Sequence, residues 1–113
     1  MKHRNTLRVH RKKWALSQGD IAHLLGFRSR SVVSVYEAGW LIPNIRIMVA
    51  YQFIFGAPLD TLFPGLQRDV EEEVVRRAVA LDRKYRSRVD GVGDRVSELL
   101  SRLAARAHNP DEV

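Results

Sequence analysis

The sequence predicts an all-α protein: five short helices over residues 1–65, followed by a two-helix extension over residues 66–113. Apolar residues recur at steps of three and four along most of the chain, which is the period of one helix face. Glycine, proline or a capping residue interrupts this pattern at short intervals. Residues 31–36, SVVSVY, have a strand-like composition, but the capping serine before them and Gly39 after them favour a helix.

Caps predict where the first two helices begin and end. Thr6 is expected to cap the first helix. Ser17, with Asp20 three residues later, has the spacing of a capping box for the second helix, and Gly26 is a good C-cap. Leu7, Arg11 and Trp14 are expected to share one face of the first helix, and Ile21, Ala22, Leu24 and Leu25 are expected to form the apolar stripe of the second.

A third helix is expected over residues 30–38, buried through Val33 and Tyr36 and ended by Gly39. The connection from the second helix is only residues 27–29, and two helices joined by so short a turn form a helix-turn-helix unit. Beyond a loop that contains proline, we expect a fourth and a fifth helix over residues 44–55 and 59–63.

The extension is expected to hold two amphipathic helices, over residues 66–88 and 95–107. Gly91 and Gly93 interrupt the pattern between them, and Asp94 is expected to cap the last helix. Two interpretations stay open. The pair folds back on its own domain, or its narrow apolar stripe pairs with another chain across a two-fold axis.

Charge divides the chain at the same place as the helix pattern. Residues 1–65 hold nine basic and three acidic side chains, and residues 66–113 hold ten of each, so the first part carries all of the net charge of +6. This asymmetry indicates a basic module that faces a polyanion, joined to a charge-balanced extension. The basic N-terminal segment, residues 2–8, is expected to be free to follow phosphates.

Several classes of protein are disfavoured by what the chain lacks. It has no cysteine, which excludes disulfides, thiolate metal sites and a cysteine nucleophile and fits a reducing compartment. No apolar run reaches the ~18–20 residues that a bilayer span needs, so we expect a cytoplasmic protein without membrane contact. The four histidines have no ligand spacing, and no phosphate loop or serine elbow occurs. We therefore expect no catalytic residue, no metal site and no cofactor.

One set of residues occurs in a characteristic order and spacing over residues 7–63. In chain order the set comprises Arg11, Leu16, Ser17, Gln18, Ile21, Ala22, Leu24, Leu25, Gly26, Val33, Ser34, Tyr36, Glu37, Ala38, Gly39, Pro43 and residues 59–63 (LDTLF). In this set the chain resembles the phage repressor and Cro-type, or XRE-like, helix-turn-helix family. The resemblance covers about half of the chain and implies a five-helix lambda-repressor-like domain. It also implies a transcriptional regulator, in the first place a repressor, that binds double-stranded DNA as a homodimer.

A recognition helix presents short or polar side chains to base edges near its N-terminal end. If the third helix begins at Arg30, the base-facing candidates are Arg30, Ser31, Ser34 and Val35. The candidates for the DNA backbone are Ser17, Gln18, Arg28, Ser29, Trp40, Asn44 and Arg46. The alternative for the helical positions is a solvated face, and Trp40 has the alternative of a partly buried lid. For Gln18 the resemblance implies a bridge from a phosphate to the recognition helix.

The resemblance also implies an ion pair between Arg11 and Glu37 that ties the first helix to the end of the third. Two departures from the family pattern bear on DNA reading: residues 27–29 make a turn one residue longer than usual, and the frequent base-facing glutamines are absent. Phe53 stands where the family has an exposed polar residue, which suits a protein interface.

A second function belongs to a different class. The chain would be a protein-interaction module, similar to an antitoxin, that binds a partner protein through its C-terminal helices.

Overall fold

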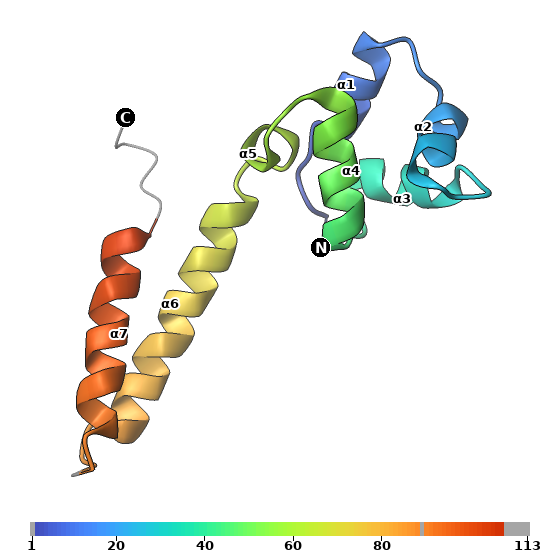
Figure 1. Cartoon of the computed structure of the whole chain (residues 1–113). Coiled ribbons are helices and arrows are strands. Elements are labelled where there is room, and N and C mark those ends of the chain that lie inside the picture. The colour runs from blue at the N-terminus through green and yellow to red at the C-terminus, as the bar shows by residue number, and fades with distance from the viewer. Residues whose placement is uncertain (1, 89, 108–113) are drawn as a thin grey trace. The chain divides into compact units, whose positions relative to one another are not determined.

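The computed structural model describes residues 2–88 and 90–107, and within these ranges it is all-helical, without a strand (Figure 1). The all-α prediction is therefore confirmed. The helices are α1 Leu7–Lys13, α2 Gln18–Leu25, α3 Ser31–Ala38, α4 Ile45–Phe55, α5 Leu59–Leu62, α6 Leu66–Tyr85 and α7 Val92–Arg106. None of the helices in the described part of the chain is long and apolar enough to cross a membrane.

The chain divides into two compact units, Met1–Leu66 and Gln67–Val113. The first unit holds α1 to α5 around a single apolar core. Its inward positions repeat at helical spacing, as in Met48, Tyr51 and Phe55 of α4, so each short helix buries one face. The side chains that are completely or almost completely buried are Leu7, Ile21, Val33, Tyr51, Leu62 and Phe63.

The expected capping box at the start of α2 is present. The Asp20 backbone N–H donates to Ser17 Oγ over 3.0 Å, and the Ser17 N–H donates to Asp20 Oδ2 over 2.9 Å. These hydrogen bonds lower the pKa of Asp20. Helix α2 ends at Gly26 as predicted.

One expectation for α1 and one for α2 are wrong, and a third is confirmed only in position. Thr6 occupies the N-cap position of α1 as expected, but its hydroxyl donates to the Thr61 carbonyl over 2.7 Å and makes no capping hydrogen bond. Trp14 lies beyond the last residue of α1 and is exposed, so it does not share a helix face with Leu7 and Arg11 as expected. Leu24 is also exposed, because Ile21 and Ala22 supply the buried face of α2.

The segment before α1 is bound to the first unit, so the prediction of a free N-terminal arm is wrong. The His3 N–H donates to the Gly39 carbonyl over 2.6 Å, and Asn5 Nδ2 donates to the Tyr36 carbonyl over 3.0 Å. Gly39 has a φ of +83°, and a Cβ there would lie 2.2 Å from the His3 carbonyl oxygen. Glycine is therefore needed at position 39 both for the left-handed end of α3 and for this close approach.

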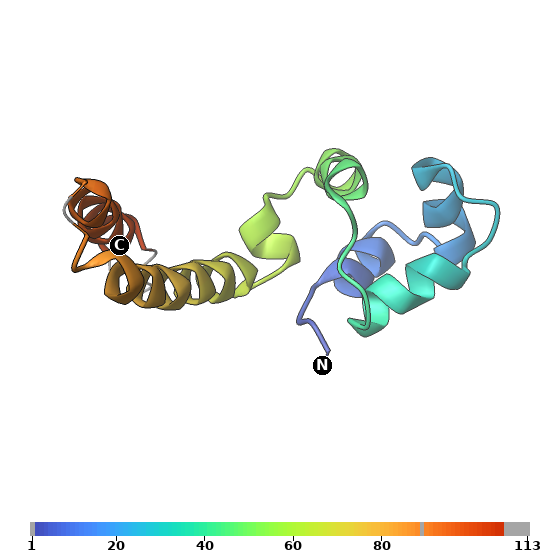
Figure 2. The same cartoon turned by 90° about the horizontal axis from the view of Figure 1, so that it is seen from below.

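The second unit is a hairpin in which α6 and α7 run antiparallel side by side, as Figures 1 and 2 both show. Its turn differs from the prediction. Helix α6 ends at Tyr85 rather than at residue 88, and α7 begins at Val92 rather than at residue 95, so Asp94 lies in the first turn instead of capping it. Gly91, with a φ of +84°, takes the N-cap position, and Asp90 Oδ1 accepts the Val92 N–H over 3.1 Å.

Two contacts hold the hairpin together near this turn. Asp82 is buried and accepts hydrogen bonds from the Ser97 hydroxyl of α7 and from Arg86 Nη2, and these hydrogen bonds lower its pKa. Gly93 is buried where α7 passes α6, and a Cβ there would lie 2.4 Å from the Tyr85 carbonyl oxygen. The backbones can approach this closely only because residue 93 has no side chain.

We expect Gly93→Ala to destabilise the hairpin by about 1–3 kcal/mol, because the added methyl group forces the two backbones apart. Thermal unfolding followed by far-UV circular dichroism measures the effect. Gly19→Ala is the matched control: Gly19 is also helical, but its Cβ would meet only Ser17 Oγ at 3.6 Å. The control should gain about 0.5–1 kcal/mol. A stabilising Gly93→Ala would contradict the close-approach argument.

The Tyr51 hydroxyl is buried and has no hydrogen-bond partner among the described residues, and burial raises its pKa. An unsatisfied buried hydroxyl costs free energy that an apolar ring does not. We therefore expect Tyr51→Phe to raise the free energy of unfolding of the first unit by about 1 kcal/mol. Urea unfolding of the full chain measures the change, and a loss of stability would indicate that the hydroxyl is satisfied.

Candidate nucleic-acid interface

The structure pairs Arg11 of α1 with Glu37 of α3. Arg11 Nε donates to Glu37 Oε2 over 2.7 Å, and Arg11 Nη2 donates to Glu37 Oε1 over 3.0 Å. The two side chains are only 11% and 4% exposed. Hydrogen bonding to Glu37 raises the pKa of Arg11 although burial opposes it. This bidentate, buried pair fixes the end of α3 against α1.

Helix α2 joins the same cluster through Gln18, whose Nε2 donates to Glu37 Oε1 over 3.2 Å. Arg11 Nη1 donates to the Leu16 carbonyl, just before α2, over 2.8 Å. One carboxylate therefore links the first residue of α2, the middle of α1 and the end of α3. The Arg11–Glu37 pair and a link from Gln18 to α3 were both expected from the resemblance. The contact of Arg11 with the Leu16 carbonyl has no signal in the sequence, because any residue could supply a carbonyl.

A hollow of about 400 Å³ opens above this cluster and brings side chains from three helices together. Gln18 and Ser34, both predicted site residues, line it. Arg8, which was expected only as the end of the basic N-terminal segment and not beside Gln18, lines it too. Arg8 stands three residues before Arg11 on α1, so helical periodicity was a signal that could have found it. The full lining is Arg8, Arg11, Gln18, Ser34, Glu37 and Ala38.

Helix α3 begins at Ser31, one residue later than expected, and Arg30 occupies the N-cap position with helical backbone angles. The reason lies in the turn before it. Ser29 Oγ accepts the Ser31 N–H over 3.1 Å and lies 2.7 Å from Ser31 Oγ, a local hydrogen-bonded turn that replaces a further helical residue. Both views place this α2–α3 connection at the outer edge of the first unit (Figures 1 and 2).

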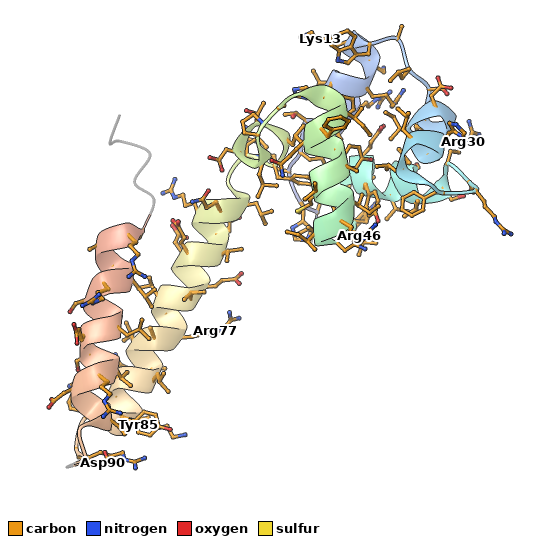
Figure 3. All side chains as sticks on the ribbon, viewed as in Figure 1. Lys13, Arg30, Arg46, Arg77, Tyr85 and Asp90 are labelled. Carbon is orange, nitrogen blue, oxygen red and sulfur yellow. The ribbon has the colours of Figure 1, made fainter. Side chains whose placement is uncertain are left out.

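The base-facing candidates all lie on the exposed surface. Ser31, Ser34 and Val35 have the i, i+3, i+4 spacing of one side of α3 and are exposed, whereas Val33 and Tyr36 are buried. Arg30 precedes them at the α2–α3 connection, where Figure 3 labels it. The first turn of α3 contains no acidic residue that would oppose an anion.

The backbone-contact candidates are distributed over α2, the start of α4 and the loops. Ser17 is engaged in the capping box, and Asn44 caps α4 by accepting the Ile47 N–H over 3.0 Å. Arg28 is exposed in the α2–α3 connection, and Arg46 is exposed in the first turn of α4 (Figure 3).

Trp40 is not a buried lid. Its side chain is 60% exposed, and Lys2 Nζ lies 4.9 Å from the centre of its ring. The N-terminal segment brings Lys2 there, because that segment follows the end of α3.

Four arginines of this surface are unpaired with any carboxylate in the described part of the chain. Arg8, Arg28, Arg30 and Arg46 are exposed and form no ion pair with any described residue. Two of the three acidic residues in the unit are occupied, Glu37 in the buried pair and Asp20 in the capping box. The net positive charge of this half of the chain is therefore available to an external polyanion.

A second exposed feature of the first unit is apolar. Phe53 of α4 is 90% exposed, as expected, and belongs to a hollow of about 550 Å³ between α2 and α4. The hollow is lined by Leu24, Leu25, Ile45, Arg46, Ile47, Val49, Ala50 and Phe53.

The described residues contain no cluster of histidine and acidic side chains that could hold a metal ion. Comparison of the chain with known protein families, with curated proteins and with solved structures gave no match.

We expect Glu37→Ala to lower the free energy of unfolding of the first unit by about 3–5 kcal/mol, because it leaves the buried Arg11 guanidinium and the Gln18 amide without their acceptor. Urea unfolding followed by tryptophan fluorescence measures this, since both tryptophans lie in this unit. The control is Lys12→Ala, an exposed cation on α1, which should change stability by less than about 0.5 kcal/mol. A loss of less than about 1 kcal/mol in the free energy of unfolding would contradict this prediction, because it is the value expected for an exposed surface ion pair.

Proposed function

We propose that the first unit is a helix-turn-helix domain of the phage repressor and Cro type, that α6 and α7 are its two-helix extension, and that the chain is a sequence-specific transcriptional regulator, acting as a repressor. One observation carries this proposal. The polar N-terminal part of α3 is exposed beside arginines that form no ion pair with any described residue, while the opposite face and the far end of the same helix are buried and held.

In the proposed complex, α3 enters the major groove with its N-terminal end foremost. Arg30 is suited to the paired O6 and N7 acceptors of a guanine, because its guanidinium is a planar fork of donors. Ser31 and Ser34 accept or donate to several base edges, and Val35 packs on a thymine methyl group.

The remaining site residues bind the sugar-phosphate backbone in this proposal. The Gln18 backbone stands at the N-terminus of α2, where free N–H groups attract a phosphate, and its side chain connects that contact to Glu37. Arg28, Arg46 and Arg8 add charge that favours every sequence equally, and Ser17, Ser29, Asn44 and Trp40 lie in the adjoining turns. In this proposal the contact through Gln18 fixes the angle of α3 on the DNA. The arginines supply most of the affinity for DNA.

Regulation follows from occupancy of the DNA. A homodimer places two α3 helices on half-sites about one helical turn, ~34 Å, apart, so the site is palindromic. A repressor bound there excludes other proteins from the same stretch of duplex.

A second candidate function is an antitoxin-like module that binds a partner protein through its C-terminal helices. The observation that favours it is the exposed apolar stripe of α6, formed by Val70, Val74 and Leu81. The two functions are compatible, because one chain can bind DNA with its first unit and protein with its second. Co-purification with a small partner protein would favour the second function.

Selection of binding sites from random double-stranded DNA tests the proposed function directly. We expect an enriched palindrome with half-sites ~34 Å apart. Arg30→Ala should cost about 1–3 kcal/mol and relax the preference at one position, because it removes a base contact. Arg46→Ala should weaken binding to all sequences alike and reduce the salt dependence by about one charge.

The control for both variants is Arg68→Ala, an exposed cation of the second unit that pairs with Glu72 over 3.3 Å. It should leave both affinity and preference unchanged. Weak, salt-sensitive binding without an enriched motif would refute a sequence-specific regulator.

A further inference from the structure

Helix α6 exposes an apolar stripe that its own unit does not cover. Val70, Val74 and Leu81 are 48%, 41% and 39% exposed, and their spacing of four and seven residues places them on one side of the helix. Helix α7 packs on a different side, where Ala78 and Asp82 are buried. Figure 3 accordingly shows Arg77, which borders the stripe, on the side of α6 away from α7.

The hairpin buries little apolar surface of its own. Among its described residues only Ala78, Asp82 and Gly93 are buried, and Leu99 of α7 is 45% exposed. Helical periodicity places Leu99 on the edge of α7 that adjoins the stripe, so both helices open to the same side. An antiparallel helix pair with so small a core gains most of its stability from a further partner.

The charges of α6 identify that partner. The first ten residues of the helix contain four acidic side chains and one basic, and the last ten contain four basic and one acidic. A second α6 packed antiparallel therefore sets the acidic half of each helix against the basic half of the other. Parallel packing in register would instead set like charges together along the whole helix.

We propose that a second copy of this chain packs antiparallel on α6, stripe against stripe across a two-fold axis. An interface across a two-fold axis uses the same surface of both copies, so that surface must be complementary to itself. The acidic first half and the basic second half of α6 meet this requirement when two copies pack antiparallel. A helix of a different protein would need an independent charge distribution of the same kind to match α6.

The stripe also predicts the register of the two helices. With Val74 of each copy opposite Leu81 of the other, Val70 meets Tyr85, and the apolar side chains cover one another in both directions. Glu73, which flanks the stripe, then lies beside Lys84 of the second copy. In this register the Arg77 side chains of the two copies lie near each other at the two-fold axis. Each Arg77 also pairs with Glu73 of its own helix over 3.7 Å, and this pair reduces the repulsion between the two guanidinium groups.

This inference rests on the proposed function, because a homodimer is the form in which that function requires the chain to act. Its tests use no DNA, so the two can fail separately. A dimer without sequence-specific DNA binding would refute the function and leave the interface standing.

The first test measures orientation by cross-linking. The chain has no cysteine, so introduced thiols report only on the interface. Under mild oxidation of the full-length chain, Val74→Cys mixed with Leu81→Cys should give a disulfide between the two variants, because antiparallel packing brings these positions together. Arg83→Cys, exposed on another side of α6, is the control and should not cross-link. Efficient cross-linking of Val74→Cys with itself would indicate a parallel pair and overturn the proposal.

The second test measures affinity by sedimentation equilibrium, with far-UV circular dichroism to verify that each variant is helical. Glu73→Lys and Lys84→Glu should each raise the dimer dissociation constant about tenfold, since each places like charges together at two symmetric positions. The double variant Glu73→Lys/Lys84→Glu should return to within about threefold of the original chain, because it restores opposite charges across the axis.

Three results would overturn the proposal. One is a chain that stays monomeric at high micromolar concentration. Another is a dimer whose affinity is unaffected by either single charge change. The third is a chain that pairs through α6 only when a different protein is added, which would assign the stripe to that partner.

Discussion

The buried contact between Arg11 and Glu37 is the constraint on which the first unit depends. Helix α3 has only eight residues, too few to be stable alone, so its position depends on what holds it. Val33 and Tyr36 bury one side of it, and Glu37 fixes its end to α1 and, through Gln18, to the start of α2. The Glu37 carboxylate is almost fully buried and has lost its contact with water. The Arg11 guanidinium and the Gln18 amide therefore stabilise its charge as well as fix the position of α3.

The two units distribute charge in opposite ways. In the first unit the single ion pair among the described residues is internal, and the remaining cations are left to solvent. In the second unit cations and carboxylates pair with one another along the helices, as in Arg68 with Glu72 and Arg102 with Glu98. A surface of uncompensated cations attracts a polyanion, whereas a balanced and patterned surface selects a protein of complementary pattern. The proposed functions of the units follow this division.

The basic N-terminal segment has a structural role that its charge does not indicate. Its basic residues suggested an arm that follows phosphates. Its backbone instead closes over the end of α3, where the His3 carbonyl comes so near to residue 39 that no side chain fits there. The segment thus adds a second restraint on α3, at the end opposite to the proposed base contacts, and it brings Lys2 to Trp40.

The sequence by itself determined the helical class, the approximate place of each helix and the capping box at Ser17, because these depend on local periodicity and on neighbours within one turn. The exposure of Phe53 was expected from its place in the family pattern. Tertiary structure decided the rest. It moved the start of α3 to Ser31 through the Ser29 turn, and it placed Arg8 beside Gln18 and Ser34. It left Trp14 and Leu24 outside the core. These outcomes depend on which helix surfaces pack against one another. The same helical periodicity in the sequence is compatible with several packing arrangements.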